Sequence, residues 1–366
     1  MYIHELKNWP ELSWNIEKLS APLAQLRHNQ GRLLGHMEAL GFKLREEANL
    51  QTITLEILKS SEIEGQMLNE DQVRSSVARR LGIDVAGLAT SDRNVEGVVE
   101  MMLDATQNFN TQLTEERLFG WHAALFPTGR SGMYKIIVGN WRNDSKGPMQ
   151  VVSGPVGRER VHYEAPAAGK LGHEMSGFLE WFNQTSKIDP VLKAAVVHLW
   201  FVTIHPFDDG NGRIGRAIAD MQLTRADGSS QRFYSMSAQI EREKKDYYDM
   251  LERTQKGTLD ITGWIEWFLG CLDRSLLNAA TLLEAVLRKA QFWERVSGIP
   301  LNERQHMMLN RLLDDFYGKL TTAKWAKLAK CSQDTALRDI QDLIEKNILA
   351  KDESGGRSTT YSLVLP

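Results

Sequence analysis

Cysteine is scarce in this sequence, with Cys271 and Cys331 as the only two among 366 residues. Zinc sites and disulfide-stapled folds need several cysteines at short, paired spacings, and two cysteines this far apart provide neither. A disulfide framework and a cysteine-based metal site are therefore excluded. We expect both thiols to be buried in the core of the protein.

The sequence also lacks a strong net charge, a signal peptide and a long apolar run. The sequence has 44 Lys and Arg residues and 47 Asp and Glu residues, which give a formal net charge of -3. A net charge this small indicates neither a nucleic acid nor a membrane surface as the partner. The opening residues, MYIHELKNWPELSW, show no basic segment followed by an apolar one. No uninterrupted apolar run reaches the roughly 18 residues that a membrane-spanning helix needs. These absences predict a cytoplasmic protein without a membrane partner.

Helical periodicity is present over most of the sequence. Apolar residues recur at spacings of three and four up to about residue 125, and helices return after Asp189, a plausible N-cap that is followed by Pro190. The segment VLKAAVVHLWFVTI (191–204) is apolar nearly all round, which predicts a helix buried inside its domain. The predicted fold class is therefore mainly α.

Residues 128–168 interrupt this pattern with glycine, proline and short β-prone runs. We predict loops and one small hairpin there. Its strands would be MQVVS (149–153) and RVHYE (160–164).

The C-terminal part, residues 301–366, reads as three helices followed by two short β segments around DESGGRS. This order resembles a winged helix-turn-helix module. The length of the chain allows two or three domains. We expect a helical N-terminal domain over residues 1–110, a core over 111–296 and the winged helix over 301–366.

A polar loop, HPFDDGNGRIGR (205–216), follows the buried helix. Pro206 biases His205 away from helical dihedral angles, so we expect the imidazole at the edge of the loop. Gly210 and Gly212 allow backbone conformations that other residues resist, and they let a ligand approach the main chain. The next helix begins here, and its free N–H groups and the positive end of its dipole would face the loop, an arrangement that binds phosphate.

Three charged side chains of the loop extend this interpretation. Arg213 and Arg216 lie three residues apart on the first helical turn and can both reach one polyphosphate. Asp209 can hold a magnesium ion that bridges phosphate oxygens. Each piece alone has an ordinary explanation, since DGNG is a common turn sequence, a lone histidine at a helix end is usually structural and surface arginines are usually solvated. Their combination in one short window favours a phosphate site with a base beside it.

The same window resembles the Fic family, whose motif HPFx(D/E)GNGRxxR is matched at every specified position. The resemblance implies a protein adenylyltransferase that transfers AMP from ATP to a hydroxyl side chain of a target protein, with Mg²⁺ bound beside the phosphates. An imidazole suits the role of general base because its free pKa lies near neutrality. The implied roles are His205 as base, Phe207 as anchor of the nucleotide-binding loop, Asp209 as magnesium ligand, Gly210, Asn211 and Gly212 as anion hole, Arg213 as phosphate contact and Arg216 as γ-phosphate contact.

Other segments resemble the same family. The hairpin at 149–163 is similar to the family's flap, which pairs with the backbone of the target protein by strand addition. The segment DYYDMLERTQKG (246–257) is similar to the part that encloses adenine, so we expect Tyr247 or Tyr248 to stack on the base, with core packing as the alternative. The opening of the chain resembles an N-terminal helical domain found in one branch of the family. Regulatory dimers occur in the family, which makes a homodimer a further expectation.

The segment SSEIEG (60–65) ends a helix expected over about residues 50–65. Ser60 and Glu64 are four residues apart and share a helix face, and Gly65 stops the helix. By spacing alone this is an ordinary helix end. It also resembles the family's inhibitory motif (S/T)xxxE(G/N), in the class that carries the motif ahead of the core. That resemblance implies that Glu64 pairs with Arg216 and occupies the arginine that would hold the γ-phosphate.

Other functions stay open beside autoinhibited AMP transfer. The fold is compatible with transfer of UMP or a phosphoryl group, with removal of AMP from a modified target, and with self-modification. A regulator that binds DNA through residues 301–366 belongs to a different functional class. This segment has ten Lys and Arg against nine Asp and Glu, and this near-neutral charge does not favour binding to a phosphate backbone. A protein-contacting or self-modified module fits this segment better. A dead site is disfavoured because the motif is complete.

Overall fold

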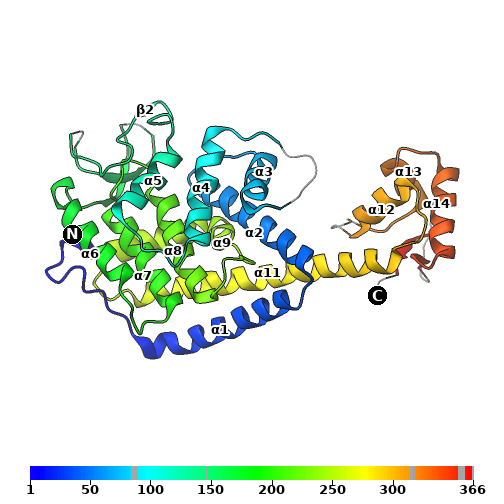
Figure 1. Ribbon diagram of the computed structural model, residues 1–366, viewed down its shortest axis with the longest axis horizontal. Coiled ribbons are helices and arrows are strands. Elements are labelled where there is room, and N and C mark those ends of the chain that lie inside the picture. Colours follow the sequence, from blue (N-terminus) through cyan, green and yellow to red (C-terminus); the bar gives the residue numbers. More distant parts are fainter. Residues whose placement is uncertain are drawn as a thin grey trace. The chain divides into compact units, whose positions relative to one another are not determined.

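The computed structural model describes residues 1–83, 89–145, 147–155, 157–313, 316, 318–352 and 359–364. The chain forms two compact units, Met1–Ala279 and Ala280–Pro366. Helices make up most of both units, which confirms the predicted mainly α fold class (Figure 1). The finer division at residues 110 and 300 stays a prediction.

Helices dominate the first unit and begin where the sequence places N-caps. The Asp189 carboxylate, for example, accepts a hydrogen bond of 2.8 Å from Val191 N, and Gly65 follows the end of α2 with a φ of 77°. The helices of this unit are η1 Ile3–Glu5, α1 Ile16–Glu38, α2 Phe42–Ile63, α3 Glu70–Leu81, α4 Arg93–Gln107, α5 Glu115–Leu125, η2 Ala168–Lys170, α6 Leu171–Asn183, α7 Pro190–Ile204, α8 Asn211–Asp227, α9 Met236–Arg242, α10 Lys244–Gln255 and the first part of α11 Thr262–Val296.

Helix α7 forms the centre of the first unit. Every residue from Val191 to Ile204 is buried, which confirms the prediction of a helix enclosed by its domain. Helix α8 packs along it, and α4 and α5 pack on α8 in turn. The loop between α7 and α8 contains residues 205–210 of the polar motif, and residues 211–216 form the start of α8, so the motif lies at the end of this buried helix.

The region between α5 and α6 contains more secondary structure than the sequence predicted. The expected hairpin is present as β3 Gln150–Ser153 paired antiparallel with β4 Arg160–Glu164. A second short hairpin, β1 Arg130–Ser131 with β2 Tyr134–Lys135, precedes it, so the prediction of a single hairpin was incomplete. The phenol of Tyr163, on β4, donates a 2.6 Å hydrogen bond to Thr203 O and ties this hairpin to α7.

The second unit contains the last part of α11, three short helices and a hairpin. The predicted order of three helices followed by two strands is confirmed, and its identification as a winged helix stays a prediction. Trp325, Ile340 and Leu343 lie in its core and are not exposed. The elements are α12 Glu303–Leu313, α13 Thr322–Leu328, α14 Gln333–Glu345, β5 Leu349–Lys351 and β6 Tyr361–Leu363.

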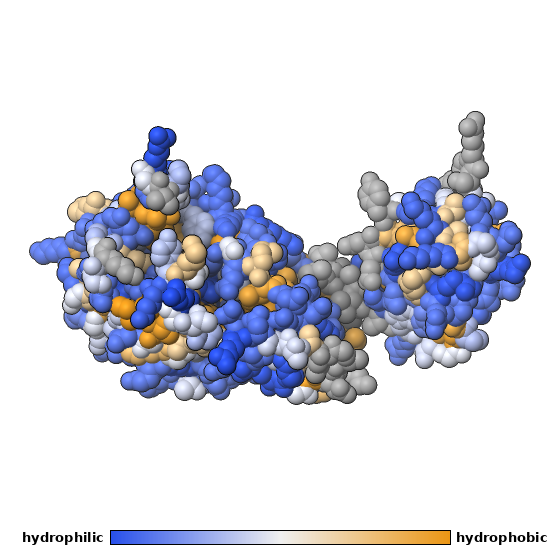
Figure 2. Space-filling view, turned by 90° about the horizontal axis from the view of Figure 1, so that it is seen from above, coloured by the Kyte–Doolittle hydropathy of each residue, from blue (hydrophilic) through white to orange (hydrophobic). Residues whose placement is uncertain are grey.

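The surface agrees with most expectations drawn from composition. The face in Figure 2 is mainly hydrophilic with scattered hydrophobic side chains. In the described part of the chain, no helix combines the length and the apolar character needed to cross a bilayer.

Cys271 is buried as expected, but Cys331 is only partly buried, which corrects the prediction of two buried thiols. Cys331 follows α13 in the turn that leads to α14, near the surface of a small unit.

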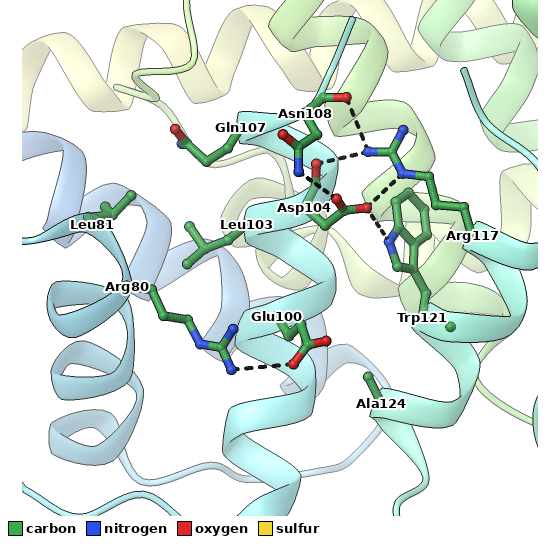
Figure 3. A pocket seen from close by; sticks show the side chains of 11 residues that line it. Arg80, Leu81, Glu100, Leu103, Asp104, Gln107, Asn108, Arg117, Trp121 and Ala124 are labelled. Carbon is green, nitrogen blue, oxygen red and sulfur yellow. Dashed lines mark hydrogen bonds and ion pairs between the residues drawn. The ribbon is translucent and has the colours of Figure 1, made fainter. Parts of the chain in front are cut away.

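A partly buried network joins α4 to α5 (Figure 3). Asp104 Oδ2 accepts hydrogen bonds of 2.6 Å from Arg117 Nε and 2.7 Å from Trp121 Nε1. The two helices approach so closely that a Cβ atom added to Gly97 would lie 1.8 Å from Ala124 O. This contact fixes α5, the helix that carries His122 into the motif.

Gly97→Ala should therefore destabilise the first unit by about 3 kcal/mol, because the added methyl group forces α4 and α5 apart. Gly120→Ala on α5 is the matched control, since Gly120 is exposed and its Cβ would meet no atom within 4 Å. The control should be neutral or more stable by about 0.5 to 1 kcal/mol, as for an exposed helical Gly→Ala change. Chemical unfolding of both variants measures the difference, and equal midpoints would contradict the close crossing.

Candidate functional site

His205 occupies a strained backbone position at the end of α7. Its φ of 50° and ψ of 60° are left-handed, a conformation that few residues other than glycine adopt. Arg142 holds this geometry from the loop after β2, donating from Nε to His205 O at 2.8 Å and from its backbone N–H to Pro206 O at 3.0 Å. Arg142 is itself buried, so the turn is fixed by a desolvated guanidinium.

The imidazole of His205 has the form of a free base. Its Nδ1 lies 3.2 Å from Val202 O, which assigns the ring proton to Nδ1 and leaves Nε2 without it. Burial lowers the pKa of His205 to about 4, opposed in part by the hydrogen bond to Val202 and the charges of Glu64 and Asp209. The ring is partly exposed and lines a pocket. A neutral imidazole with a free Nε2 can take a proton at neutral pH.

The loop after His205 is held by contacts with its own backbone. The side chain of Asn211 accepts from Phe207 N at 3.0 Å and donates to Phe207 O at 2.8 Å. Phe207 is completely buried and stacks on His122 with ring centres 4.2 Å apart. These contacts shape the loop, and Asn211 also lines the pocket. Phe207 therefore anchors the loop, as the resemblance implied.

His122 fixes the far side of the same loop. It accepts a hydrogen bond from Gly139 N at Nδ1, 3.2 Å away, so its proton is on Nε2 and points to Asp209 O at 3.1 Å. Burial lowers the pKa of His122 to about 4, opposed by the hydrogen bond to Asp209 O and by nearby carboxylates. A charged ring would lose the acceptor that Gly139 uses.

The glycines of the motif bring backbone N–H groups to the pocket. Gly210 is the N-cap of α8 with a φ of 84° and offers no side-chain cap. The N–H groups of the first turn, which include Gly212 and Arg213, have no acceptor inside the helix by geometry. Together with the helix dipole they form an anion-binding end.

Both arginines of the motif are buried at this end. Arg213 donates from Nη1 to Gln66 Oε1 at 2.7 Å, and its guanidinium lies 5.0 Å from the centre of the Phe126 ring. Arg216 donates from Nε to Ser60 Oγ at 2.9 Å and from Nη2 to Ser60 O at 2.7 Å. Arg216 Nη1 is buried and has no hydrogen-bond partner among the described residues.

Glu64 occupies the anion-binding end. Its Oε1 lies 2.8 Å from Arg216 Nη2, so the ion pair implied by the resemblance is present. Burial opposes the charge of Arg216, but Glu64 together with Tyr247 and Tyr248 outweighs it, so the pKa of the guanidinium is raised. A Cβ atom built on Gly212 would lie 2.1 Å from the same oxygen. The carboxylate therefore rests directly on the start of α8, at its anion-binding end.

Asp209 projects from the loop toward β1. Its Oδ2 accepts a hydrogen bond from Ser131 Oγ, and its Oδ1 accepts from Gly210 N at 2.5 Å. The neighbouring Asp208 instead accepts from Ile137 N at 2.9 Å. In the described ranges of the chain, no three His, Cys, Asp or Glu residues are grouped as a metal cage.

The motif opens into a pocket of about 610 Å³. It is lined by Val151 and Val152 of β3, by His205 and by both predicted tyrosines. Tyr247 is only 2% exposed and its hydroxyl lies 2.8 Å from His198 Nε2, whereas Tyr248 is 38% exposed. The ring of Tyr248 is thus the one that a base in the pocket can reach by stacking.

Several residues that shape the site were not found from the sequence. Arg142, His122 and Gln66 each contact the motif from segments far away in the chain. Ser131 contacts Asp209 from the hairpin that the sequence analysis missed. None of them belongs to a spacing pattern, so no signal in a single sequence distinguishes them from ordinary polar residues.

Comparisons with known proteins agree with this geometry. A family model described as "Fic/DOC family" matches residues 112–223, and one described as "Domain of unknown function (DUF4172)" matches residues 2–83. "Protein adenylyltransferase Fic" of Culex quinquefasciatus is 34% identical over 113 residues, which are 30% of this chain. The relative of the same name from Aedes aegypti matches equally well. The chain spans 21% of the length of these curated relatives.

Two solved structures share the fold. A Fic family protein from Desulfovibrio desulfuricans G20 aligns with a TM-score of 0.52 at 21% identity, over 94% of this chain and 96% of that one. A Fic domain containing signaling protein from Bacteroides thetaiotaomicron VPI-5482 aligns with a TM-score of 0.51 at 20% identity, over 71% of this chain and 97% of that one. These likenesses show the architecture of the chain.

Acid should destabilise the first unit through His122. Its pKa is about 4 in the folded protein, against 6.5 for an unperturbed histidine, so the unfolded chain binds the proton more tightly. The stabilisation, about 3 kcal/mol for such a shift, is complete above pH 6.5 and is lost as the pH falls toward 4. His122→Gln keeps an N–H donor for Asp209 O but does not titrate.

Urea unfolding of the wild type and of His122→Gln between pH 8 and pH 5 tests this. The variant should lose less stability on acidification, by up to about 1.4 kcal/mol per pH unit, even if it is less stable at pH 8. Parallel pH profiles would show that His122 does not titrate as described.

Proposed function

Residues 112–223 of this chain belong to the Fic/DOC family, and on that basis we propose that the protein is a protein adenylyltransferase that moves AMP from ATP to a hydroxyl side chain of a target protein. The observation that carries this proposal is the free Nε2 of His205 beside the glycine-lined start of α8. One group can accept a proton and the other can hold phosphates, within a single pocket.

The residues of the motif divide the reaction between them. His205 Nε2 takes the proton of the target hydroxyl as its oxygen attacks the α-phosphorus of ATP, and the bond to pyrophosphate breaks. The N–H groups around Gly210 and Gly212 bind phosphate oxygens, and Arg213 neutralises their charge. Arg216 holds the γ-phosphate when Glu64 does not occupy it. Tyr248 stacks on the base from the wall of the pocket.

Asp209 fits a magnesium ion that arrives with the nucleotide. Mg²⁺ is commonly bound by one or two carboxylates together with substrate phosphates and water, and Asp209 offers one carboxylate at the mouth of the phosphate site. Ser131 holds this carboxylate toward β1. The ion would neutralise phosphate charge in the transition state.

The β3–β4 hairpin, residues 149–163, is the proposed dock for the target protein. Val152 and Val161 face each other in its register and are 47% and 37% exposed, so the hairpin presents apolar side chains and backbone to an extended segment. Such pairing would aim the target hydroxyl at His205.

A cytoplasmic location and a homodimer belong to the same proposal.

Glu64 inhibits the enzyme in this proposal. The carboxylate takes the guanidinium of Arg216 and covers Gly212, so ATP cannot place its γ-phosphate there. Inhibition is reversible because the side chain of Glu64 is 31% exposed and ends a helix. Two alternatives exist for the same site. One is removal of AMP with the help of Glu64, and the other is transfer of another phosphate-linked group.

The second unit supports a protein-binding role more than a DNA-binding one. The exposed face of α14 carries Asp334 and Glu345 beside Arg338, so it presents no cationic surface to a phosphate backbone. Leu337 on the same face is 38% exposed. Retention of the protein on random duplex DNA with a steep salt dependence would overturn this preference.

Glu64→Gly should raise AMP transfer, because it frees Arg216 for the γ-phosphate. We expect an increase of at least about tenfold, the effect of one charge-assisted contact. Incorporation of label from [α-³²P]ATP into lysate proteins and into the enzyme itself, with Mg²⁺ present, measures it. Glu62→Gly is the matched control: Glu62 lies two residues earlier and pairs with Lys59, so this change loosens the helix end without touching Arg216. Equal activity of Glu64→Gly and wild type would count against inhibition by Glu64.

His205→Ala should abolish transfer in both the wild-type and the Glu64→Gly backgrounds, by at least about 100-fold, because no other base is positioned on the hydroxyl. ATP binding in the Glu64→Gly background should persist, since the phosphates are held by α8, and calorimetry measures it. His173→Ala, on the exposed surface of α6, is the control and should transfer normally. Activity that survives loss of His205 would remove it from the role of base.

A further inference from the structure

Helices α2 and α8 face each other through residues that repeat every four positions. Residues four apart share one helix face, so each set forms a row along its helix. The outer contacts of the two rows are the ion pair between Glu64 and Arg216 and the hydrogen bonds from Arg216 to Ser60. The rows are Glu56, Ser60 and Glu64 on α2, and Gly212, Arg216 and Asp220 on α8.

The inner end of the two rows brings two carboxyl groups together. Glu56 is 5% exposed and Asp220 is 2% exposed, and their side chains are within hydrogen-bonding reach of each other. Glu56 Oε2 accepts hydrogen bonds from Ser235 Oγ at 2.7 Å and from Ser237 N at 3.0 Å. Asp220 Oδ1 accepts from Arg232 Nη2 at 2.8 Å.

The remaining oxygen of each carboxyl group is buried and has no protein donor. Glu56 Oε1 and Asp220 Oδ2 have no hydrogen-bond partner among the described residues as long as both groups are ionised. Two neighbouring carboxylates that each keep an unsatisfied oxygen are strongly unfavourable in a buried site. A single proton between them satisfies both.

The charges around the pair favour such a proton. Burial raises the pKa of Asp220 well above its usual value, the negative charge of Glu56 raises it further, and Arg232 opposes both effects. Arg232 is one cation shared with a third acid, Asp227. The other titratable groups that interact with the pair or with Arg232 are Tyr234 and Cys271, which add no positive charge.

We propose that Asp220 and Glu56 share one proton, with Asp220 Oδ2 as donor and Glu56 Oε1 as acceptor, and that this bond is a second latch between α2 and α8. It holds α2 in the position from which Glu64 reaches Arg216. Both are positioning residues, since Glu64 and Ser60 lie between them and the phosphate site. The role of the latch rests on the proposed autoinhibited AMP transfer, whereas the shared proton does not.

Substitutions of the pair separate the latch from simple packing. Glu56→Ala removes the acceptor and leaves Ser235 Oγ and Ser237 N unpaired, so α2 loses its inner attachment. Asp220→Asn keeps a donor next to Glu56 Oε1 and an acceptor for Arg232. We expect Glu56→Ala to raise AMP transfer about tenfold over wild type, and Asp220→Asn to stay within about twofold. Glu56→Ala combined with His205→Ala should be inactive.

The shared proton has a readout that needs no substrate. At pH 7 the infrared spectrum of the full chain should show the carbonyl stretch of a protonated carboxylic acid. That band should disappear in Asp220→Asn and persist in Glu62→Gln, a surface control on the same helix. Hydrogen exchange of the amides at 57–63 should become faster in Glu56→Ala and remain unchanged in Asp220→Asn, while the amides of α4 should not change.

The outcomes distinguish failure of the latch from failure of the proposed function. If Glu64→Gly raises transfer and a folded Glu56→Ala does not, the latch is wrong, but inhibition by Glu64 is supported. If the infrared band survives in Asp220→Asn, the shared proton is wrong. If the band behaves as expected but neither Glu64→Gly nor Glu56→Ala raises transfer, both the latch and the proposed autoinhibition fail. Should Glu56→Ala not fold, Glu56→Leu fills the volume without an acceptor and replaces it.

Discussion

The buried charge of Arg216 is the constraint on which the rest of the site depends. Its side chain is 2% exposed, and a guanidinium that is desolvated to this extent needs an anion beside it. Either the protein supplies that anion or a ligand does. Glu64 supplies it here, while Arg216 Nη1 still lacks an acceptor within the described part of the chain. Glu64 and an anion from solution would therefore need the same charge, and only one of them can pair with Arg216 at a time.

The loop between α7 and α8 is the second constraint, and its geometry comes from side chains that bind its backbone. His205 stays left-handed because Arg142 binds its carbonyl oxygen, and the turn after it stays compact because Asn211 brackets Phe207. The Nδ1 proton of His205 is fixed by one carbonyl oxygen in the last turn of α7, that of Val202. A base with a defined tautomer thus follows from the way a buried helix ends.

The sequence was sufficient for the parts of the site that are continuous in the chain. The buried helix 191–204, the glycine-rich turn and the helix after it could be read directly, because the spacing of Gly, Asn and Arg determines local backbone geometry. Helix α8 begins at Asn211, two residues before the predicted start at Arg213. The hairpin 149–163 was also visible from its short β-prone runs. Pairing of Glu64 with Arg216 came from a family resemblance, since spacing alone made residues 60–65 an ordinary helix end.

The rest could not be predicted because it depends on contacts between distant segments. Nothing in the local sequence around Arg142 or His122 indicates that they hold the motif. The hairpin β1–β2 has two residues in each strand, too few for an alternation to be seen. Glu56 and Asp220 illustrate the same limit, because a buried pair of acids is visible only once α2 and α8 have been placed side by side.

The placement of α2 also gives a physical role to a segment whose matching family model carries no function. Residues 2–83 match the domain of unknown function and include all of α2, whereas the motif lies within the Fic/DOC match at 112–223. Both segments belong to one compact unit, and Ser60 and Glu64 of the first contact Arg216 of the second. An anion from solution can reach Arg216 only if the end of α2 moves away from it. The N-terminal segment therefore covers the buried charge of Arg216, and a movement of α2 would leave that charge without its partners.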